Sequence, residues 1–216
     1  MKRKIFITGC ARSGTTLLAR LFHAFENCQV MNEEVGLEAF CNIDFSDQTA
    51  DFLVGKRTQD TIFSNTLSDT EIVKQTELIA NNQIIVINCV RDGRHVVHSW
   101  VTAWQMYDPQ AWINSIIQAQ NYSKFIELQI KYEDLIENPD KAQATIWSLI
   151  AGLKTNYDFS DYPEFVPEDS FKTNHFAHSL RPINNSQGKR APKTYRQRPN
   201  DIEYFETLLS ELNYIK

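Results

Sequence analysis

The 216-residue sequence lacks the features that mark several common protein classes. It contains only four cysteines, none in a CxxC pair, so we expect reduced thiols and no disulfide framework. The apolar run that follows the basic start, Ile5–Ile7, is too short for a signal-peptide core or a membrane span. The net charge of −5 argues against general binding to nucleic acid or to anionic membranes. These absences predict a cytoplasmic protein with no membrane span and no nucleic-acid partner.

The composition is that of an ordinary folded protein. It is 42% apolar and 23% charged, and its length fits one domain over residues 1–216. Basic residues gather at one place, between Gly188 and Arg198, without an acidic residue among them. Such a tract in an acidic protein suggests a single anionic ligand, although a solvated basic face is the alternative.

Apolar runs alternate between strand and helix periodicity along the chain. The nearly continuous apolar run at 84–90 is typical of a parallel strand buried on both faces. The alternation predicts an α/β fold with a central parallel sheet flanked by helices on both faces. The segments 42–82 and 156–199 are polar and weakly patterned, and we expect them to be surface segments. The expected strands are 4–8, 28–31, 84–90 and 126–132, and the expected helices are 15–25, 94–104, 109–125, 139–152 and 200–212.

The first motif lies between the first strand and the first helix, over Gly9–Thr16 (GCARSGTT). A glycine-bounded turn before a helix directs backbone N–H groups toward one point, which favours a phosphate-like anion. The pattern differs from the nucleotide-triphosphatase loop because Thr15 stands where that loop has its lysine. The cation of this motif is instead Arg12, inside the loop. A degenerate kinase loop is the alternative.

The second motif follows the strand at 84–90 and covers Val90–Ser99 (VRDGRHVVHS). Together with Arg12–Leu18 (RSGTTLL), it resembles the sulfotransferases that use 3′-phosphoadenosine 5′-phosphosulfate (PAPS), in the carbohydrate and tyrosylprotein branches. The alternative for the second motif is a turn with an Arg–Asp pair, in which Ser99 bonds to its own helix backbone.

The resemblance implies a P-loop-like domain and assigns residues to the two ends of the donor. The 5′-phosphosulfate would lie at Arg12, Ser13, Gly14, Thr15 and Thr16. The 3′-phosphate would be held by Arg91 and Ser99, and a guanidinium binds phosphate with two parallel hydrogen bonds. A third contact would come from Gly188, Lys189 and Arg190, where Ala191 departs from the aromatic residue that relatives often have. The segment at 131–139 (KYEDLIENP) also resembles the family, and we expect it to serve packing and a helix start.

The implied reaction is in-line transfer of a sulfuryl group from PAPS to a hydroxyl or amine acceptor. No metal is expected, because PAPS has no polyphosphate chain for Mg²⁺ to bridge, and Arg12 would stabilise charge on the bridging oxygen. The general base would be Glu33, with Glu34 adjacent, unless an acidic residue here caps a helix near Gly36. His98 and His95 are a second choice, and Lys56 lies where relatives place a lysine near the phosphosulfate.

Two other functions stay open from the sequence. One is a P-loop kinase or nucleotide hydrolase that acts on a small metabolite, although the loop lacks the lysine that such an enzyme needs. The other is a protein that binds 3′-phosphoadenosine 5′-phosphate (PAP) or another adenine nucleotide without catalysis. A carbohydrate, a peptide tyrosine, a lipid and a small alcohol are all compatible acceptors, and the sequence predicts no oligomeric state.

Overall fold

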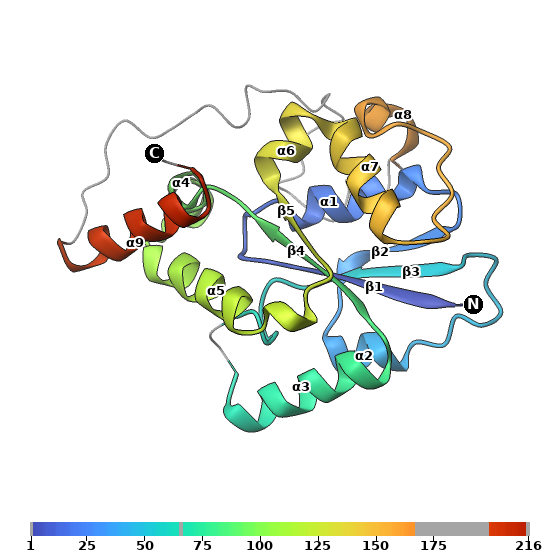
Figure 1. The fold of residues 1–216 in the computed structure, drawn as a ribbon, viewed down its shortest axis with the longest axis horizontal. Helices are drawn as coiled ribbons and strands as arrows, with labels where there is room; N and C mark the ends of the chain where they lie inside the picture. Colours follow the sequence, from blue (N-terminus) through green and yellow to red (C-terminus); the bar gives the residue numbers. More distant parts are fainter. Residues whose placement is uncertain (1, 65–66, 167–198, 215–216) are drawn as a thin grey trace.

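Five parallel strands form the centre of the molecule, and helices cover both faces of their sheet (Figure 1). The computed structural model describes residues 2–64, 67–166 and 199–214. The strands are β1 (Arg3–Thr8), β2 (Cys28–Glu34), β3 (Phe52–Lys56), β4 (Ile85–Val90) and β5 (Leu128–Lys131). They lie in the order β2-β3-β1-β4-β5, and every neighbouring pair is parallel. The predicted fold class is confirmed.

The helices follow the strands in the alternating order that the sequence predicts. Some of them are short 3₁₀ turns that continue or precede a longer helix. In chain order they are α1 (Thr15–Leu21), η1 (Phe22–Ala24), α2 (Leu37–Asn42), α3 (Asp69–Asn81), α4 (Gly93–Trp104), α5 (Pro109–Asn121), η2 (Ser123–Phe125), α6 (Tyr132–Glu137), α7 (Pro139–Leu149), η3 (Phe159–Asp161), α8 (Tyr162–Phe165) and α9 (Pro199–Glu211).

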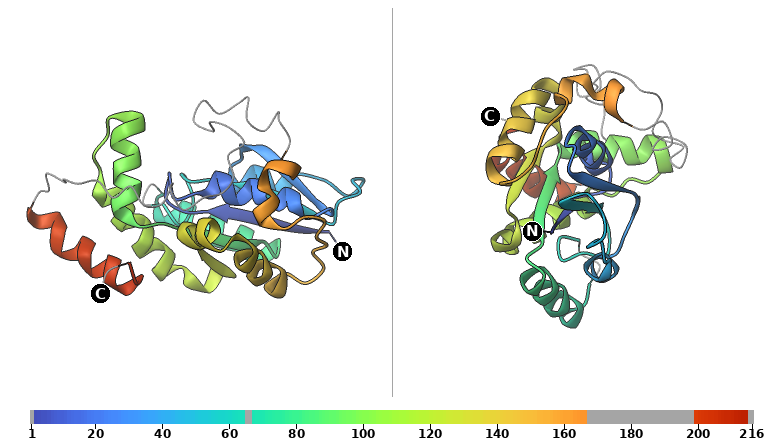
Figure 2. Two further views of the ribbon diagram at one scale, coloured as in Figure 1. Left: turned by 90° about the horizontal axis from the view of Figure 1, so that it is seen from above. Right: turned by 90° about the vertical axis from the view of Figure 1, so that its right-hand side faces the viewer.

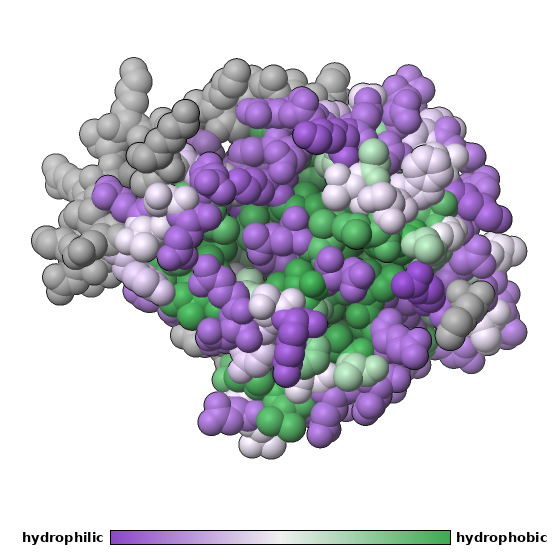
Figure 3. Space-filling view, viewed as in Figure 1, coloured by the Kyte–Doolittle hydropathy of each residue, from purple (hydrophilic) through white to green (hydrophobic). Residues whose placement is uncertain are grey.

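Alternate residues of each strand supply two separate cores, one on each face of the sheet. In β1, Ile5 and Ile7 pack with α1, α7 and η3, while Phe6 packs with α2 and α3 on the opposite face. All six residues of β4 are buried, as expected for a strand covered on both faces. Figure 3 shows one side of this arrangement, with apolar residues gathered in the middle and polar residues over the outer helices.

A third apolar cluster lies beyond the carboxyl ends of the strands. It joins α4, α5 and α9 around Trp112, which is fully buried and packs on Phe205 with ring centroids 4.8 Å apart. Figure 2 shows α4 and α9 at the end of the molecule opposite the N-terminus. This cluster fixes α4 and α5 where parallel α/β sheets bind ligands, outside the carboxyl ends of their strands.

The prediction of a surface segment at 42–82 is wrong in part. Residues Phe52–Lys56 form β3, which is fully buried between β2 and β1, and Asp69–Asn81 form a helix. β3 has only three consecutive apolar residues, so its identity depends on its two neighbouring strands and not on a local pattern. The helix carries a capping box between Ser68 and Glu71, a signal that was present in the sequence. In the described part of the chain, no helix is long and apolar enough to cross a membrane.

Candidate functional site

The loop between β1 and α1 has a shape that two glycines make possible. Gly9 has a φ of 144°, and a Cβ there would lie 2.2 Å from the carbonyl oxygen of Cys89. Gly14 has a φ of 99°, and a Cβ there would lie 2.4 Å from the ring of Tyr132. Arg12 also adopts a positive φ, of 72°. The loop is therefore pressed against the ends of β4 and β5, and it turns back at Arg12.

Ser13 holds this loop together from inside. Its side chain is fully buried, and both its backbone N–H and its hydroxyl donate to the carbonyl of Cys10, at 3.0 and 2.6 Å. Thr15 and Thr16 begin α1, whose first N–H groups have no partner within the helix. The backbone of this turn is therefore a suitable anion cradle, while the Ser13 hydroxyl is engaged within the loop.

Arg12 connects the two sequence motifs directly. Its Nε donates to the hydroxyl of Ser99 at 2.9 Å, and its guanidinium lies 5.6 Å from the ring centroid of Trp104. Ser99 and Trp104 both belong to α4, while Arg12 belongs to the loop after β1. The structure therefore brings Arg12 and Ser99 into contact, although they are far apart in the sequence.

Arg91, directly after β4, contacts the same loop. Its guanidinium donates to the carbonyl oxygen of Arg12 at 3.0 Å and stacks 4.2 Å from the ring centroid of Tyr132. The Nε of Arg91 is buried, and none of the described residues accepts a hydrogen bond from it. Burial, and then the positive charge of Arg91, lowers the pKa of the Arg12 guanidinium. Two partly buried cations beside one backbone turn favour the binding of an anion between them.

The end of β4 that carries Arg91 is held by a network of hydrogen bonds. Glu133 accepts from the backbone N–H of Asp92 at 3.1 Å and from the hydroxyl of Tyr214 at 3.0 Å. The indole of Trp112 donates to the carbonyl of Arg91 at 3.1 Å. Burial, and then the charge of Glu133, raises the pKa of the Tyr214 hydroxyl, which keeps it a hydrogen-bond donor. Segments distant in the sequence thus fix the backbone at Arg91.

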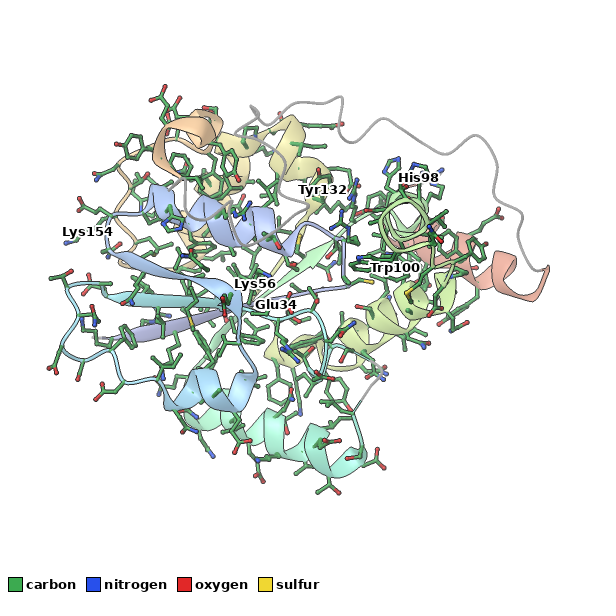
Figure 4. All side chains as sticks on the ribbon, turned by 180° about the vertical axis from the view of Figure 1, so that it is seen from behind. Glu34, Lys56, His98, Trp100, Tyr132 and Lys154 are labelled. Carbon is green, nitrogen blue, oxygen red and sulfur yellow. The ribbon has the colours of Figure 1, made fainter. Side chains whose placement is uncertain are left out.

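An ion pair lies at the carboxyl edge of the sheet, where β2 and β3 end. Lys56 Nζ is 3.0 Å from Glu34 Oε1, with the lysine side chain 5% exposed and the glutamate 36% exposed. The hydroxyl of Thr58 donates weakly to the same carboxylate oxygen, at 3.4 Å. Figure 4 shows Glu34 and Lys56 together near the centre of the molecule. The carboxylate of Glu34 and the buried ammonium of Lys56 therefore form an ion pair at this edge of the sheet.

An irregularity in β2 produces this pair. Val30 pairs with Val54, but Glu34 pairs with Lys56, so β2 advances four residues while β3 advances two. A continued regular register would have placed Asn32, not Glu34, opposite Lys56. Bulges of this kind frequently re-aim a side chain at a functional site.

The other predicted bases occupy different surroundings. Glu33 is exposed, and among the described residues it has no hydrogen bond or ion pair. The helix-capping alternative for an acidic residue here is wrong, because the N-cap of α2 is Gly36, without a side-chain bond. His98 is exposed on α4, apart from the Glu34–Lys56 pair (Figure 4). His95 is mostly buried, with its Nδ1 4.0 Å from Glu133.

Both interpretations of the second motif find support in the geometry. Arg94 pairs with the carboxylate of Asp92, as the turn alternative predicts. Ser99 nevertheless accepts a hydrogen bond from Arg12, so it is turned toward the loop. The third predicted contact, formed by Gly188, Lys189 and Arg190, lies outside the described residues. Among residues 2–64, 67–166 and 199–214, no group of three or more His, Cys, Asp or Glu residues could hold a metal ion.

Comparison with known proteins identifies the family. The family described as "Sulfotransferase domain" matches residues 2–154 of this chain. The chain belongs to the sulfotransferase family. The predicted activity, sulfuryl transfer, is confirmed at this level.

Solved structures of sulfotransferases share the fold. A sulfotransferase domain from the Synechococcus PCC 7002 olefin synthase has a TM-score of 0.71 and 17% identity, over 96% of each chain. A domain from the curacin biosynthetic pathway has a TM-score of 0.67 and 18% identity, over 100% of this chain and 99% of that one. Mouse SULT7A1, solved with PAP, has a TM-score of 0.53 and 14% identity, over 98% of this chain and 84% of its own. Among curated protein sequences, none matches this chain.

The structure brings the two sequence motifs together, because Arg12 contacts both Ser99 and Arg91. The assignment of these residues to the two ends of the donor stays a prediction. The pairing of Glu34 with Lys56 was not predicted, because it depends on the irregular register of β2. The packing role expected for the segment after β5 is confirmed, since Tyr132 lies against both Gly14 and Arg91.

Proposed function

We propose that this sulfotransferase takes its sulfuryl group from PAPS and binds the donor across the carboxyl ends of β1 and β4. The observation that carries the proposal is the cluster of Arg12, Arg91 and Ser99 around one backbone turn. In this arrangement Arg91 and Ser99 hold the 3′-phosphate. Arg12 and the N–H groups at the start of α1 face the 5′-phosphosulfate. The complex of mouse SULT7A1 with PAP supports a bisphosphorylated adenosine as the ligand.

The proposed reaction is a direct in-line transfer. The acceptor oxygen attacks sulfur, the new O–S bond forms, and the bond from sulfur to the bridging phosphate oxygen breaks to release PAP. Negative charge grows on that bridging oxygen, and the guanidinium of Arg12 stabilises it from a fixed position. The donor requires no metal in this scheme, because its phosphates are neutralised by the two arginines.

We further propose Glu34 as the general base that removes the acceptor proton. Its carboxylate is held by Lys56 and Thr58 at the edge of the sheet where the loop after β1 lies. Glu33 is the alternative from the sequence, and its exposed position gives it no fixed orientation. A carboxylate base and an arginine in the loop agree with the carbohydrate and tyrosylprotein branches, to which we assign the chain. The four free thiols support a cytoplasmic location.

The experiment that tests this function uses PAPS with a labelled sulfuryl group. The protein is incubated with labelled PAPS and a fractionated cell extract, with and without a metal chelator. Label should move to an acceptor at the same rate in both samples, and PAP should accumulate in equal amount. Binding of PAP without transfer to any fraction would instead support a non-catalytic nucleotide-binding protein.

A further inference from the structure

The chain reverses its direction directly after α9. Asn213 adopts a left-handed conformation with a φ of 57°, and the N–H of Tyr214 donates to the carbonyl of Leu209 at 2.7 Å. This is the Schellman arrangement that commonly ends a helix. Leu208 and Leu209 are buried in the apolar cluster around Trp112, which packs α9 beside α4 and α5 (Figure 1). The turn, and the tyrosine that follows it, therefore have a fixed place in the fold.

Two cationic side chains tie Tyr214 to other elements. Lys131, at the end of β5, donates to the carbonyl of Leu212, and its ammonium lies 4.8 Å from the centroid of the Tyr214 ring. Arg94, in the first turn of α4, donates to the carbonyl of Tyr214 at 3.3 Å. The tyrosine is therefore anchored to one strand that ends, and one helix that begins, at the carboxyl edge of the sheet.

The hydroxyl of Tyr214 bonds to a carboxylate that fixes the joint between β4 and α4. It donates to Oε2 of Glu133 at 3.0 Å, while Oε1 of this carboxylate accepts the backbone N–H of Asp92 at 3.1 Å. Asp92 is the N-cap of α4, so it joins Arg91 to the helix that carries Ser99. The Glu133 side chain is only 20% exposed, and a charged acceptor strengthens both bonds. Tyr214 therefore helps to fix the backbone from which both proposed 3′-phosphate ligands extend.

The same bonds engage Glu133 away from the arginine that is proposed to bind phosphate. Glu133 directly follows Tyr132, whose ring centroid lies 4.2 Å from the guanidinium of Arg91. Arg91 nevertheless has no carboxylate partner within the part of the chain that the structure describes. A carboxylate paired with this guanidinium would compete with a phosphate for it. Since both oxygens of Glu133 have other donors, the arginine is available for an anion.

We infer that Tyr214 is a positioning residue for donor binding, which acts through Glu133 on the orientation of Arg91 and of α4. This inference rests on the proposed function, because it concerns the proposed 3′-phosphate site. Tyr214 acts here without contact with the donor. The loss of its hydroxyl leaves Oε2 of Glu133 without this donor and loosens the hold on Asp92. Binding of the 3′-phosphate should suffer, whereas contacts to the rest of the nucleotide should not.

A comparison of PAP with AMP tests the inference, because AMP lacks the 3′-phosphate. Wild-type protein and Tyr214→Phe are titrated with both nucleotides by calorimetry. Loss of the hydrogen bond should weaken PAP binding about fivefold and leave the Kd of AMP unchanged. Tyr204→Phe, at an exposed tyrosine of α9, is the matched control and should bind both nucleotides as the wild type does.

The possible failures of this experiment are distinguishable. An unchanged Kd of PAP in Tyr214→Phe overturns the inference. Equal losses for PAP and AMP also overturn it, because they would show a general structural role of the tyrosine. A wild-type protein that does not prefer PAP to AMP would instead contradict the proposed 3′-phosphate site, and with it the proposed function.

Variants of Glu133 test the route of the effect. Glu133→Ala should reduce the preference for PAP over AMP at least as much as Tyr214→Phe does. Glu133→Gln keeps an oxygen that can accept from Asp92, so it should retain part of the preference. Addition of Tyr214→Phe to Glu133→Ala should cause no further loss, whereas additive losses would overturn the route through Glu133. An unchanged preference in Glu133→Ala overturns the inference even if Tyr214→Phe folds poorly.

Discussion

The proposed donor side and the proposed acceptor side of the reaction centre are built in different ways. On the donor side, two short motifs bring Arg12, Arg91 and Ser99 into direct contact. On the proposed acceptor side, Glu34 and Lys56 meet through an irregular strand register. The proposed donor contacts therefore depend on two local motifs, whereas the proposed base depends on the register of two neighbouring strands. Changes on the two sides should have separable effects.

The largest effect should come from Glu34→Gln, on the acceptor side. The amide keeps the size of the side chain but cannot take the acceptor proton, so kcat should fall by about 10²–10⁴-fold. PAP affinity should be unchanged, because the proposed donor contacts come from the loop after β1, from Arg91 after β4 and from α4. Steady-state rates and PAP titrations measure the two quantities. Glu33→Gln is the matched control, and a large loss for this variant but not for Glu34→Gln would restore Glu33 as the base.

Arg12→Ala should have the next largest effect, on turnover. Removal of the cation beside the bridging oxygen should lower kcat by about 10²–10³-fold. The Kd of PAP should change much less, because charge grows on the bridging oxygen only while the sulfuryl group leaves it. PAP has no sulfuryl group, so its binding does not report this stabilisation. Arg12→Lys, which keeps a positive charge, should recover part of the rate. Equal losses of kcat and PAP affinity would remove the transition-state role of Arg12.

Arg91→Ala should act mainly on donor affinity. Loss of a charge-assisted phosphate contact costs about 1.5–3 kcal/mol, which corresponds to roughly a 10- to 100-fold weaker Kd for PAP. Because Arg91 also stacks on Tyr132, thermal unfolding should be followed in the same samples. Arg3→Ala, at the opposite end of β1, is the control and should leave the PAP Kd unchanged. An unaltered Kd in Arg91→Ala would contradict the proposed 3′-phosphate site.

The smallest effect should come from Ser99→Ala. The variant removes one hydrogen bond from an uncharged donor, worth about 1 kcal/mol, so PAP should bind roughly fivefold more weakly. Ser148→Ala is a matched control, because Ser148 is a helix serine that bonds to its own backbone at the carbonyl of Thr145. If the two variants bind PAP equally, the Ser99 hydroxyl does not hold the 3′-phosphate.

The sequence predicted the fold well wherever local pattern and burial agree. β1 and β4 were predictable because their apolar runs are continuous, and α1 because its apolar residues recur at helical spacing. β3 was missed because it is a five-residue strand that contains a glycine. Such a strand is stable here only because it pairs with a neighbouring strand on each side. The N-terminus of α3 was predictable from Ser68 and Glu71, but its weak apolar face concealed it. The single-domain organisation over residues 1–216 stays a prediction.

The candidate site shows the same difference between local pattern and distant packing. The two motifs that carry Arg12, Arg91 and Ser99 were visible in the sequence because each lies at a junction between a strand and a helix, and the role of these residues in donor binding stays a prediction. The pairing of Glu34 with Lys56 was not, because two extra residues in β2 decide which side chain faces the lysine. Chemistry carried by a single turn is visible in a sequence, and chemistry assembled from several segments requires the structure.

The central claim is that one bisphosphorylated adenosine binds across the carboxyl ends of β1 and β4. Calorimetric titration of the protein with PAP, ADP and ATP, each with and without Mg²⁺, tests it most directly. The 3′-phosphate contacts predict that PAP binds at least about tenfold more tightly than ADP or ATP, a difference of roughly 1.4 kcal/mol. The affinity for PAP should not depend on Mg²⁺. Binding of ATP with Mg²⁺ that equals or exceeds the binding of PAP would contradict the account.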